Sequence, residues 1–368
     1  MNTAMRLILD EEQRRLADSV RALLADHCPP QRVREVMADD GAGIDRRLWT
    51  QLAELGVTGL LVPEAAGGAG AGHVDRCVVL AELGAALAPV PYLASAVLAT
   101  DTAIALGDDT LAEDLLPEIA AGQQTVAVAV ADAGGRWGSA ADSVQAARDG
   151  GHWRLAGEAA FVVDGPFADH VLVYADHGWF VVDGGAVSWR PSRTLDPTRR
   201  MARAEFAGTS ARYVPCEDPA GVLEAVWQRA AVALAAEQLG GMRRVLDDTV
   251  EYAKVRVQFG RPIGSQQAVK HACADLYASC EQAEAVLWHA AWTADHDPAA
   301  LPEAAALAQV VLGPAAFDTA ASGLQLHGGI GYTWEHDAHL YYKRAKTSEL
   351  LLGTPAEHRA WLADALSI

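Results

Sequence analysis

Residues 256–267 read RVQFGRPIGSQQ and interrupt a succession of long helical patterns. The stretch before them, residues 220–256, is rich in alanine and leucine. The stretch after them, residues 271–294, places apolar side chains three to four residues apart, at Leu276, Cys280, Ala283 and Leu287. Residues 303–326 form a further helical stretch. Because apolar positions at this spacing line one face of a helix, the C-terminal part of the chain is predicted to be a helical bundle.

Residues 124–215 have a different character. Short runs of β-branched and aromatic residues follow one another without a helical pattern between them. Asp-Gly-Gly separates these runs at residues 149–151 and 183–185, which is a signal for β-hairpins. Runs spaced this closely favour antiparallel strands in a barrel or sandwich over a parallel sheet.

Residues 10–120 are again mainly helical by pattern. Asp10 stands where an N-cap is expected, and the first predicted helix places apolar side chains on one face at Leu16, Val20, Leu23 and Leu24. The order is therefore helical, β, helical. We expect three domains, with boundaries at 1–122, 123–216 and 217–368.

Composition excludes several classes of partner. The chain has 368 residues, 51% of them hydrophobic, and a formal net charge of −19. Nucleic acids and anionic membranes bind basic patches, so neither is an expected partner. The N-terminus has no signal-peptide pattern, and proline or charge interrupts the longest apolar stretches, so we expect a cytoplasmic protein with no membrane span.

Motifs for other chemistries are weak. The five cysteines are odd in number and include no C-x-x-C pair, which argues against disulfides and structural zinc. His336 and His339 lack a Glu-x-x-His partner, so no metal site is expected. GGAGAG at residues 67–72 lacks the G-x-G-x-x-G spacing of a phosphate-binding loop and is interpreted as a turn.

Three C-terminal segments carry residues suited to a phosphate-containing ligand, at residues 256–267, 325–332 and 353–354. Arg256 can hold a phosphate by charge-assisted hydrogen bonds. Gly328 and Gly329 allow close approach of the backbone to a ligand, and Gln267 and Gln325 supply amides. Together they suit a dinucleotide that lies on a helical bundle.

These segments resemble the acyl-CoA dehydrogenase family. The most specific matches are VEYAKVRVQFGRPIGSQQAVKHACADL at residues 250–276 and LQLHGGIGYTWEH at residues 324–336. Further matches extend the resemblance over nearly the whole chain, at residues 49–70, 80–99 and 195–206. The fold that the resemblance implies is α+β and mainly α: an N-terminal helical domain, a middle antiparallel β-barrel and a C-terminal four-helix bundle.

The resemblance implies an FAD-binding dimer or tetramer that dehydrogenates an acyl-CoA thioester, with electron-transfer flavoprotein as the acceptor. In the family a glutamate removes the α-proton while the β-hydrogen goes to the flavin. The residues implied to meet the flavin nucleotide of a neighbouring subunit are Arg256, Gln258, Phe259, Gln266 and Gln267. The residues implied to meet its pyrophosphate and adenosine part are Gln325, Gly328 and Gly329.

The catalytic glutamate is missing from its usual positions. Where many members carry Tyr-Glu-Gly-Thr, this chain has Leu352 in place of the glutamate. Another branch carries Glu-Arg early in the long helix, and counting back from Phe259 places Ala230 and Ala231 there. Neither leucine nor alanine accepts a proton. The alternative base is Glu349, one turn before Leu352.

The flavin-ring side is altered as well. The family's Trp-x-Thr in the middle domain is matched by Phe161 and Val163, and valine cannot hydrogen-bond the flavin as threonine does. The family's Thr-x-x-x-Gly-Ser loop is replaced by DAGGRWGSAADS at residues 132–143, in which Gly138 and Ser139 remain.

The residues that would reach a neighbour's flavin are thus kept, and those that would serve the chain's own flavin are changed. We expect the base-lacking subunit type of the actinobacterial α2β2 acyl-CoA dehydrogenases, which completes the flavin site of a homologous subunit carrying the glutamate. A steroid side-chain or branched acyl-CoA is the expected substrate class. Two alternatives stand beside this reading: a self-sufficient homo-oligomer with Glu349 as base, and a non-redox binding or scaffold protein of the same fold.

Overall fold

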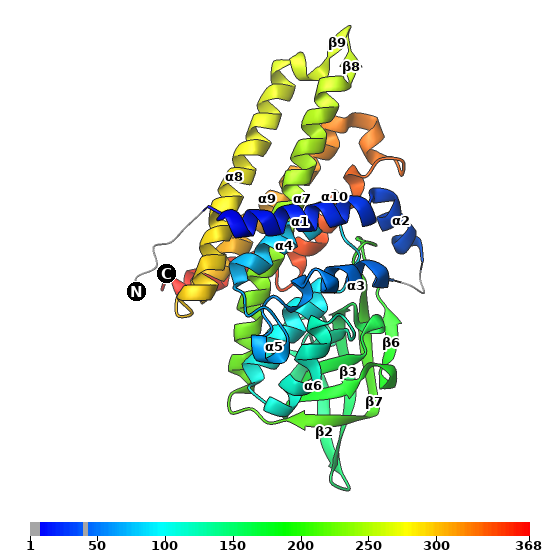
Figure 1. Cartoon of the computed structure of the whole chain (residues 1–368), viewed down its shortest axis with the longest axis vertical. Helices are drawn as coiled ribbons and strands as arrows, with labels where there is room; N and C mark the ends of the chain where they lie inside the picture. The colour runs from blue at the N-terminus through cyan, green and yellow to red at the C-terminus, as the bar shows by residue number, and fades with distance from the viewer. Residues whose placement is uncertain (1–7, 40–42) are drawn as a thin grey trace. The chain divides into compact units, whose positions relative to one another are not determined.

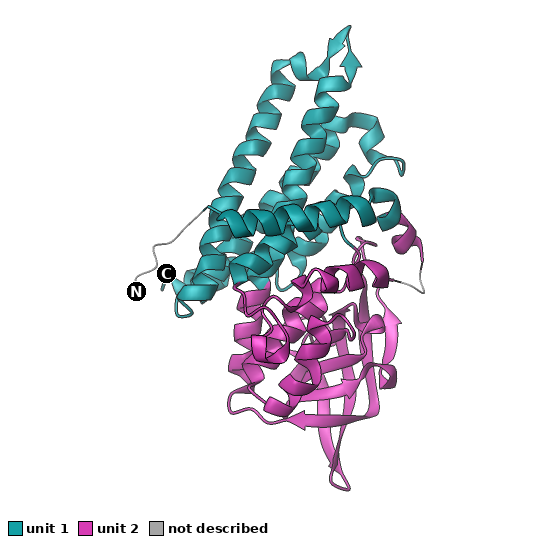
Figure 2. Cartoon of the chain, viewed as in Figure 1, with its two compact units in different colours: residues 1–33, 73–88, 231–368 teal, residues 34–72, 89–230 magenta. Residues whose placement is uncertain are grey.

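The computed structural model describes residues 8–39 and 43–368 and divides them into two units (Figure 2). The helical unit comprises residues 8–33, 73–88 and 231–368. The sheet unit comprises residues 34–39, 43–72 and 89–230. Helices dominate, and the predicted order of helices, strands and helices is confirmed (Figure 1). The three domain boundaries stay a prediction.

Long helices form the helical unit. They are α7 (Pro219–Val255, which begins in the sheet unit), α8 (Gln267–His296), α9 (Leu301–His327) and α10 (Ala338–Leu350). Shorter helices complete it: α1 (Glu11–His27), α4 (His73–Ala86) and α11 (Pro355–Ala365). The apolar stripe predicted on α8 is buried, at Leu276, Cys280, Ala283 and Leu287. The amphipathic spacing therefore identified the inward face of this helix correctly.

Two glycines set the distance between α4 and α7. A Cβ built on Gly84 would lie 2.1 Å from the carbonyl oxygen of Glu237, and one built on Gly240 would lie 1.8 Å from that of Ala81. Only glycine permits backbones to approach this closely. The contact also brings α4 beside the buried ion pair between Glu237 and Arg344.

The N-cap predicted at Asp10 is confirmed. Its carboxylate accepts from the backbone N–H of Gln13, whose side chain bonds back in a capping box. Val20 and Leu24 are buried, as expected for the apolar face. Arg21, beside this apolar face, forms an ion pair with Glu82 of α4. These contacts attach α1 to α4.

In the described part of the chain, one helix is long and apolar enough to cross a membrane by length and composition, the stretch Leu301–Tyr332 that contains α9. The sequence pattern had indicated none. More than half of its most apolar window is buried, because α9 packs against α8, α10 and α11. Burial among other helices accounts for its apolar composition.

The sheet unit contains seven strands of one curled sheet. They are β1 (Val126–Ala129), β2 (Val144–Asp149), β3 (His152–Val163), β4 (His170–Ala175), β5 (Gly178–Asp183), β6 (Ser188–Pro191) and β7 (Met201–Val214). The order is β1-β4-β5-β7-β3-β2, with β6 beside β7. All pairs are antiparallel, as predicted, except β1–β4, which is parallel. Its apolar core includes Leu155, Phe180 and Phe206.

The two predicted hairpins have different outcomes. At residues 149–151 the prediction is right, because Asp149 pairs with His152 across a turn in which Gly150 and Gly151 have positive φ. At residues 183–185 it is wrong, because β6 pairs with β7 and not with β5. The N–H of Gly184 donates to the carbonyl of Asp169, and a Cβ there would lie 2.0 Å from the carbonyl oxygen of Ala168. The turn is therefore fixed to the start of β4 and directs the chain away from β5.

Further helices belong wholly or mainly to the sheet unit. They are α2 (Pro30–Ala38), α3 (Arg46–Glu54), the π-helix η3 (Tyr92–Ala99), α5 (Thr100–Leu106) and α6 (Asp109–Ala120). Ser95 of η3 hydrogen-bonds both the N–H and the carbonyl of Val126. This contact occupies backbone groups at the start of β1.

Candidate functional site

The sequence RVQFGRPIGSQQ folds into an exposed hairpin at the far ends of α7 and α8 (Figure 1). Strand β8 (Val257–Gln258) pairs with β9 (Arg261–Pro262). The turn between them holds Phe259 at φ +53° and Gly260 at φ +77°, and the Phe259 side chain is 93% exposed. A non-glycine residue at positive φ is uncommon and costs conformational energy. The backbone here presents an aromatic ring away from its own unit.

This hairpin is basic in an otherwise acidic chain. Between Glu251 and Asp275 the sequence has no acidic residue. The basic side chains of this interval are all exposed, at Lys254, Arg256, Arg261 and Lys270. Gln258 and Gln267 are exposed and Gln266 is half-buried. Exposed guanidinium groups and amides beside an apolar ring are the donors that a diphosphate with an attached ring system requires.

Gln325, Gly328 and Gly329 lie where α9 ends. Gly328 has φ +65°, and no atom of the described residues lies within 4 Å of a Cβ built on either glycine. The backbone of this turn is thus open to a ligand. Gln325 is exposed, and its Oε1 accepts a hydrogen bond from the hydroxyl of Tyr332 in the short helix η8 (Gly328–Tyr332).

Tyr252 connects the two predicted segments. It lies on α7 one turn before Arg256, and its ring stacks on His327 at a centroid distance of 4.6 Å. Its hydroxyl donates to the carbonyl of His327, while Nδ1 of His327 bonds the carbonyl of Gly323 at 2.8 Å. The end of α9, and with it the diglycine, is therefore held against the end of α7.

A pocket of about 510 Å³ adjoins this turn, and we call it the η8 pocket. It is lined by Ala321, Leu324, Gln325, Tyr332, Trp334, His339, Tyr342 and Lys343. Of these only Gln325 was predicted as a site residue. The stretch TWEH at residues 333–336 carried a signal for Trp334, an aromatic residue shortly after the diglycine turn, but no role was inferred for it.

No carboxylate occupies the expected base positions among the described residues. Leu352 is buried at φ +67°, and Gly353 follows at φ +120° with a Cβ position 2.8 Å from the ring of Trp361. Ala230 and Ala231 are buried. The alternative base, Glu349, forms an ion pair with Lys346 at 2.6 Å.

A comparison with known proteins agrees with the fold. Residues 10–123 match the description "Acyl-CoA dehydrogenase, N-terminal domain", and residues 222–367 match "Acyl-CoA dehydrogenase, C-terminal domain". Acyl-CoA dehydrogenase IpdE2 of Mycobacterium tuberculosis is 40% identical over 94% of this chain and 95% of its own. The chain belongs to the acyl-CoA dehydrogenase family.

Two solved structures resemble this family member over nearly its whole length. The ChsE4–ChsE5 complex from Mycobacterium tuberculosis matches with a TM-score of 0.88 and 31% identity, over 99% of both chains. A variant of the Tcur3481–Tcur3483 steroid ACAD matches with a TM-score of 0.86 and 33% identity, over 97% of this chain and 98% of that one. Both are described by their names as pairs of different chains.

In this family member, the stretch matched to the flavin-ring side packs against the loop at residues 132–143. Val163 is buried and offers no side-chain hydrogen bond. Phe161 has φ +50°, and its ring lies 2.2 Å from where a Cβ of Gly135 would be. The loop is fixed at Ala133, whose N–H donates to Ser143 and whose carbonyl accepts from Arg203.

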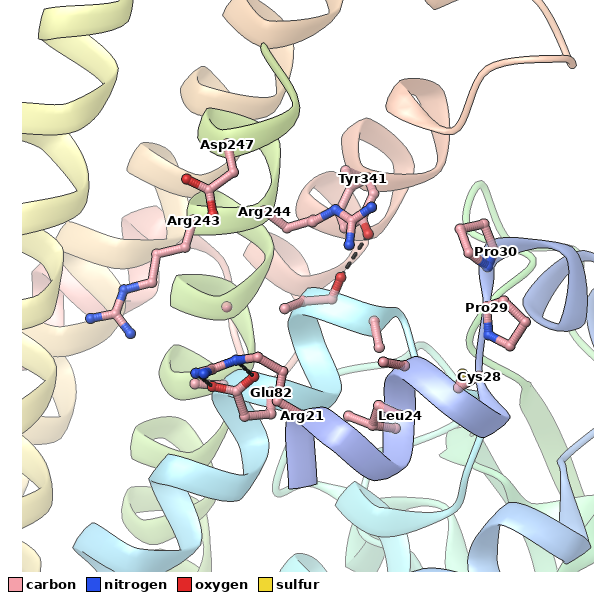
Figure 3. A pocket seen from close by; sticks show the side chains of 15 residues that line it. Arg21, Leu24, Cys28, Pro29, Pro30, Glu82, Arg243, Arg244, Asp247 and Tyr341 are labelled. Carbon is pink, nitrogen blue, oxygen red and sulfur yellow. Dashed lines mark hydrogen bonds and ion pairs between the residues drawn. The ribbon is translucent and has the colours of Figure 1, made fainter. Parts of the chain in front are cut away.

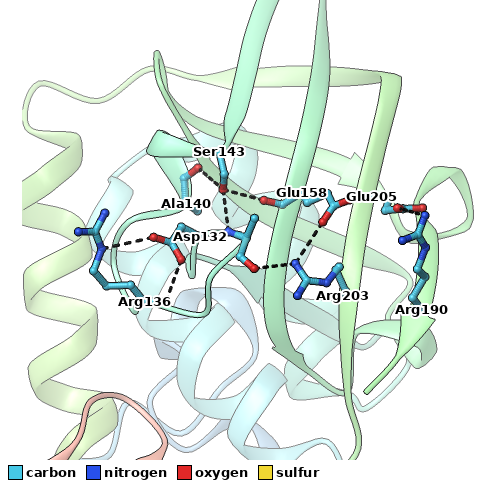
Figure 4. A network of polar contacts seen from close by, with 9 residues as sticks. Asp132, Arg136, Ala140, Ser143, Glu158, Arg190, Arg203 and Glu205 are labelled. Carbon is cyan, nitrogen blue, oxygen red and sulfur yellow. Dashed lines mark hydrogen bonds and ion pairs between the residues drawn. The ribbon is translucent and has the colours of Figure 1, made fainter. Parts of the chain in front are cut away.

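The same loop is closed by ion pairs. Arg136 pairs with Asp132 at 3.3 Å and with Asp142 at 2.6 Å. Arg203 also pairs with Glu158, at 3.1 Å (Figure 4). The charged groups beside this loop are therefore paired within the chain, and the ring of Phe161 lies against the loop backbone while it remains 45% exposed. The hairpin and the diglycine turn instead present exposed donors, at Arg256, Gln258, Gln267 and Gln325.

A second pocket, of about 490 Å³, lies among α1, α4, α7 and α10 (Figure 3). Its three arginines are each paired with a carboxylate: Arg21 with Glu82, Arg243 with Glu284 and Arg244 with Asp248. Burial opposes the ionisation of Glu284, but hydrogen bonds from Arg243 and Trp288 lower its pKa. Since these cations are already neutralised, the pocket is a poor site for phosphate.

The described residues include no set of side chains suited to bind a metal ion. Among residues 8–39 and 43–368, no group of three or more His, Cys, Asp or Glu side chains is arranged to hold a metal ion. His336 and His339 instead make ring contacts, with His327 and Trp334.

Proposed function

We propose that this chain is the base-lacking subunit of a heteromeric, FAD-dependent acyl-CoA dehydrogenase and completes the flavin site of a homologous subunit. An α2β2 assembly is the proposed form, and the cytoplasm is the proposed location. The partner subunit supplies the glutamate that removes the α-proton of the acyl-CoA.

The observation that carries this proposal is a contrast within the chain. The hairpin that would reach another subunit is exposed, basic and led by the ring of Phe259. The positions for its own base hold Leu352, Ala230 and Ala231. A chain that has the exposed hairpin but no proton acceptor at the expected base positions is suited to complete the flavin site of another subunit.

The chain's own residues would bind and orient the FAD. FAD supplies the acceptor for the hydride that leaves the β-carbon. Arg256 would hold a phosphate of the diphosphate by a charge-assisted hydrogen bond, and Gln258, Gln266 and Gln267 would add neutral donors. Phe259 would cover an apolar part of the nucleotide and exclude water from it. Gly328 and Gly329 would allow the backbone to approach the pyrophosphate, with Gln325 on its adenosine side.

The substrate class and the electron acceptor are also proposed. One similar structure carries the word steroid in its name, which supports a steroid side-chain or branched acyl-CoA. Electron-transfer flavoprotein is the proposed acceptor, as for the family. Pairs of different chains among the similar structures support the heteromeric form.

Co-expression tests the proposal. The chain is produced alone and together with a homologous acyl-CoA dehydrogenase subunit that carries the glutamate. Flavin absorbance per protein is measured after gel filtration, together with dye-coupled oxidation of a panel of acyl-CoA thioesters. We expect flavin and activity only in the co-expressed complex. A yellow, active single chain would contradict the proposal.

A further inference from the structure

The hairpin and the diglycine turn are carried by two different helices. The hairpin follows α7, and the diglycine turn follows α9. A ligand that both segments hold binds tightly only if their spacing is correct before the ligand arrives, because free energy is otherwise lost in ordering them. The contacts that fix the spacing of these two helix ends therefore influence binding without touching the ligand.

The helices α7 and α9 approach closely at Gly323. A Cβ built on Gly323 would lie 2.4 Å from Cγ1 of Val245 and 3.1 Å from Oγ1 of Thr249. Gly323 lies about one turn before the end of α9, and Thr249 lies more than one turn before the end of α7. This contact sets the distance between the helices, but other contacts must fix their ends.

Tyr252, in the last turn of α7, contacts both ends. Its ring stacks on that of His327, the last residue of α9, at a centroid distance of 4.6 Å and an interplanar angle of 29°. Its hydroxyl donates to the carbonyl of His327 at 3.3 Å. Its own carbonyl accepts from the N–H of Arg256 at 2.9 Å. The side chain of Tyr252 thus holds the end of α9, and its backbone holds the first residue of the hairpin.

His327 passes this contact on to the diglycine turn. Its ring is buried, and its Nδ1 bonds the carbonyl of Gly323 at 2.8 Å, which fixes the orientation of the imidazole. A Cβ built on Gly331 would lie 3.1 Å from Cβ of His327 and 2.8 Å from the carbonyl oxygen of Leu324. The turn therefore folds back directly onto His327, and a shift of His327 would displace the turn.

We propose that Tyr252 is a positioning residue for FAD, which holds the diglycine turn at the distance from Arg256 that one bound nucleotide spans. This rests on the proposed function. Tyr252 acts through Arg256 and His327, and not by contact with the nucleotide. Its effect on binding therefore requires that both segments engage the same ligand, which a residue that only stabilises the fold does not require.

Titration of FAD into the deflavinated co-expressed complex, followed by flavin fluorescence, tests this role. We expect Tyr252→Leu and Arg256→Ala each to weaken FAD binding about tenfold. Tyr252→Phe keeps the stacked ring and should bind FAD like the wild type. The matched control is Trp292→Leu, which removes a similar stack on His296, at 4.8 Å, from the end of α8 opposite to the hairpin. It should also bind FAD normally.

The double variant separates positioning from a general loss of stability. Tyr252→Leu combined with Arg256→Ala should bind FAD about as weakly as Arg256→Ala alone, because the spacing has no effect once one of the two contacts is gone. A double variant that is about tenfold weaker than Arg256→Ala would overturn the proposal, since the two residues would then act independently.

Hydrogen exchange of the full-length chain without FAD gives a second measurement. The amides of residues 328–331 should exchange faster in Tyr252→Leu than in the wild type and in Tyr252→Phe. Unchanged exchange would contradict the positioning role. If Arg256→Ala binds FAD normally, the proposed function itself fails. If Arg256→Ala binds FAD weakly and Tyr252→Leu binds it normally, only the role of Tyr252 is refuted.

Discussion

Arg256 directly follows α7, and its exposed guanidinium is one of two on the hairpin, with that of Arg261. We predict that Arg256→Ala lowers the FAD content of the co-expressed complex more than Glu349→Ala does. The lost charge-assisted contact is worth about 1.5–3 kcal/mol. Glu349 has no assigned ligand, because its carboxylate already pairs with Lys346.

Flavin absorbance per protein after gel filtration measures the difference. Arg154→Ala removes another exposed arginine, one paired with Asp149 on the sheet unit, and serves as the charge-matched control. Equal flavin loss in the three variants would argue against a specific role of the hairpin.

Leu352, at the position expected for the base, has an unusual backbone conformation. A buried leucine at φ +67° is a strained conformation, of order 1–3 kcal/mol, that persists only where the surroundings impose it. The neighbouring Gly353 is confined by Trp361 and His358. The loop thus has an unusual backbone at a position where the side chain cannot accept a proton.

The buried imidazole of His358 lies beside Gly353 of this loop. We predict that it makes the stability of the chain depend on pH. Burial lowers its pKa from 6.5 to about 4, against the smaller opposing effect of Glu357. Between these pH values the unfolded chain binds a proton that the folded chain does not, so stability is complete above pH 6.5 and falls as the pH drops toward 4. The loss amounts to about 1.4 kcal/mol per pKa unit, or roughly 3 kcal/mol in total.

Urea unfolding at pH 7, 5.5 and 4 measures this slope. His358→Gln removes the titrating group, so the free energy of unfolding of the variant should fall less over this range than that of the wild type. Parallel profiles for the two proteins would show that His358 does not cause the acid sensitivity.

At the scale of elements, the contact between α4 and α7 gives a prediction with a built-in control. Gly240→Ala places a methyl group 1.8 Å from the carbonyl oxygen of Ala81, so the helices must separate. We expect a loss of at least about 2 kcal/mol in the free energy of unfolding. Gly241→Ala meets its nearest atom, Cδ1 of Tyr341, at 3.9 Å.

The control variant should gain about 0.5–1 kcal/mol, because alanine favours a helix interior over glycine. The melting temperatures of both variants, measured by thermal unfolding, test this prediction. If Gly240→Ala and Gly241→Ala have the same melting temperature, the close approach of the two helices does not fix the bundle.

The sequence correctly predicted the elements that depend only on residues close together along the chain. The α8 stripe, the Asp10 cap and the hairpin at residues 149–151 depend on neighbouring residues alone. The hairpin at residues 183–185 was wrong because Gly184 is required by a contact with Ala168, which the local pattern does not contain. The parallel β1–β4 pair is likewise a long-range contact.

The candidate site divides in the same way. The glycines and glutamines of QLHGGIGY and the hairpin carry recognisable spacing, so they could be named from sequence. Trp334 and Lys343 line the same pocket only because η8 and α10 pack together. The sequence around Lys343, a lysine that follows two tyrosines, does not predict this contact. That Phe161 packs on Gly135 also follows from the structure alone.

At the scale of the whole molecule, the basic hairpin contrasts with a net charge of −19. Charges of one sign on an otherwise opposite surface steer association, and salt screens them. We predict that assembly of the complex slows as salt rises from 50 mM to 500 mM, by about tenfold or more. Stopped-flow mixing of the separately purified subunits measures this, and a rate independent of salt would show that the hairpin does not guide assembly.

The central claim is that the working glutamate lies on the partner chain. The most direct test is kcat of the co-expressed complex in which this chain carries Glu349→Gln. We predict a kcat close to that of the wild-type complex, because the mostly buried carboxylate of Glu349 is already paired with Lys346 on the same helix, α10. A fall of about a hundredfold or more, the size expected for loss of a general base, would mean that this chain holds its own base.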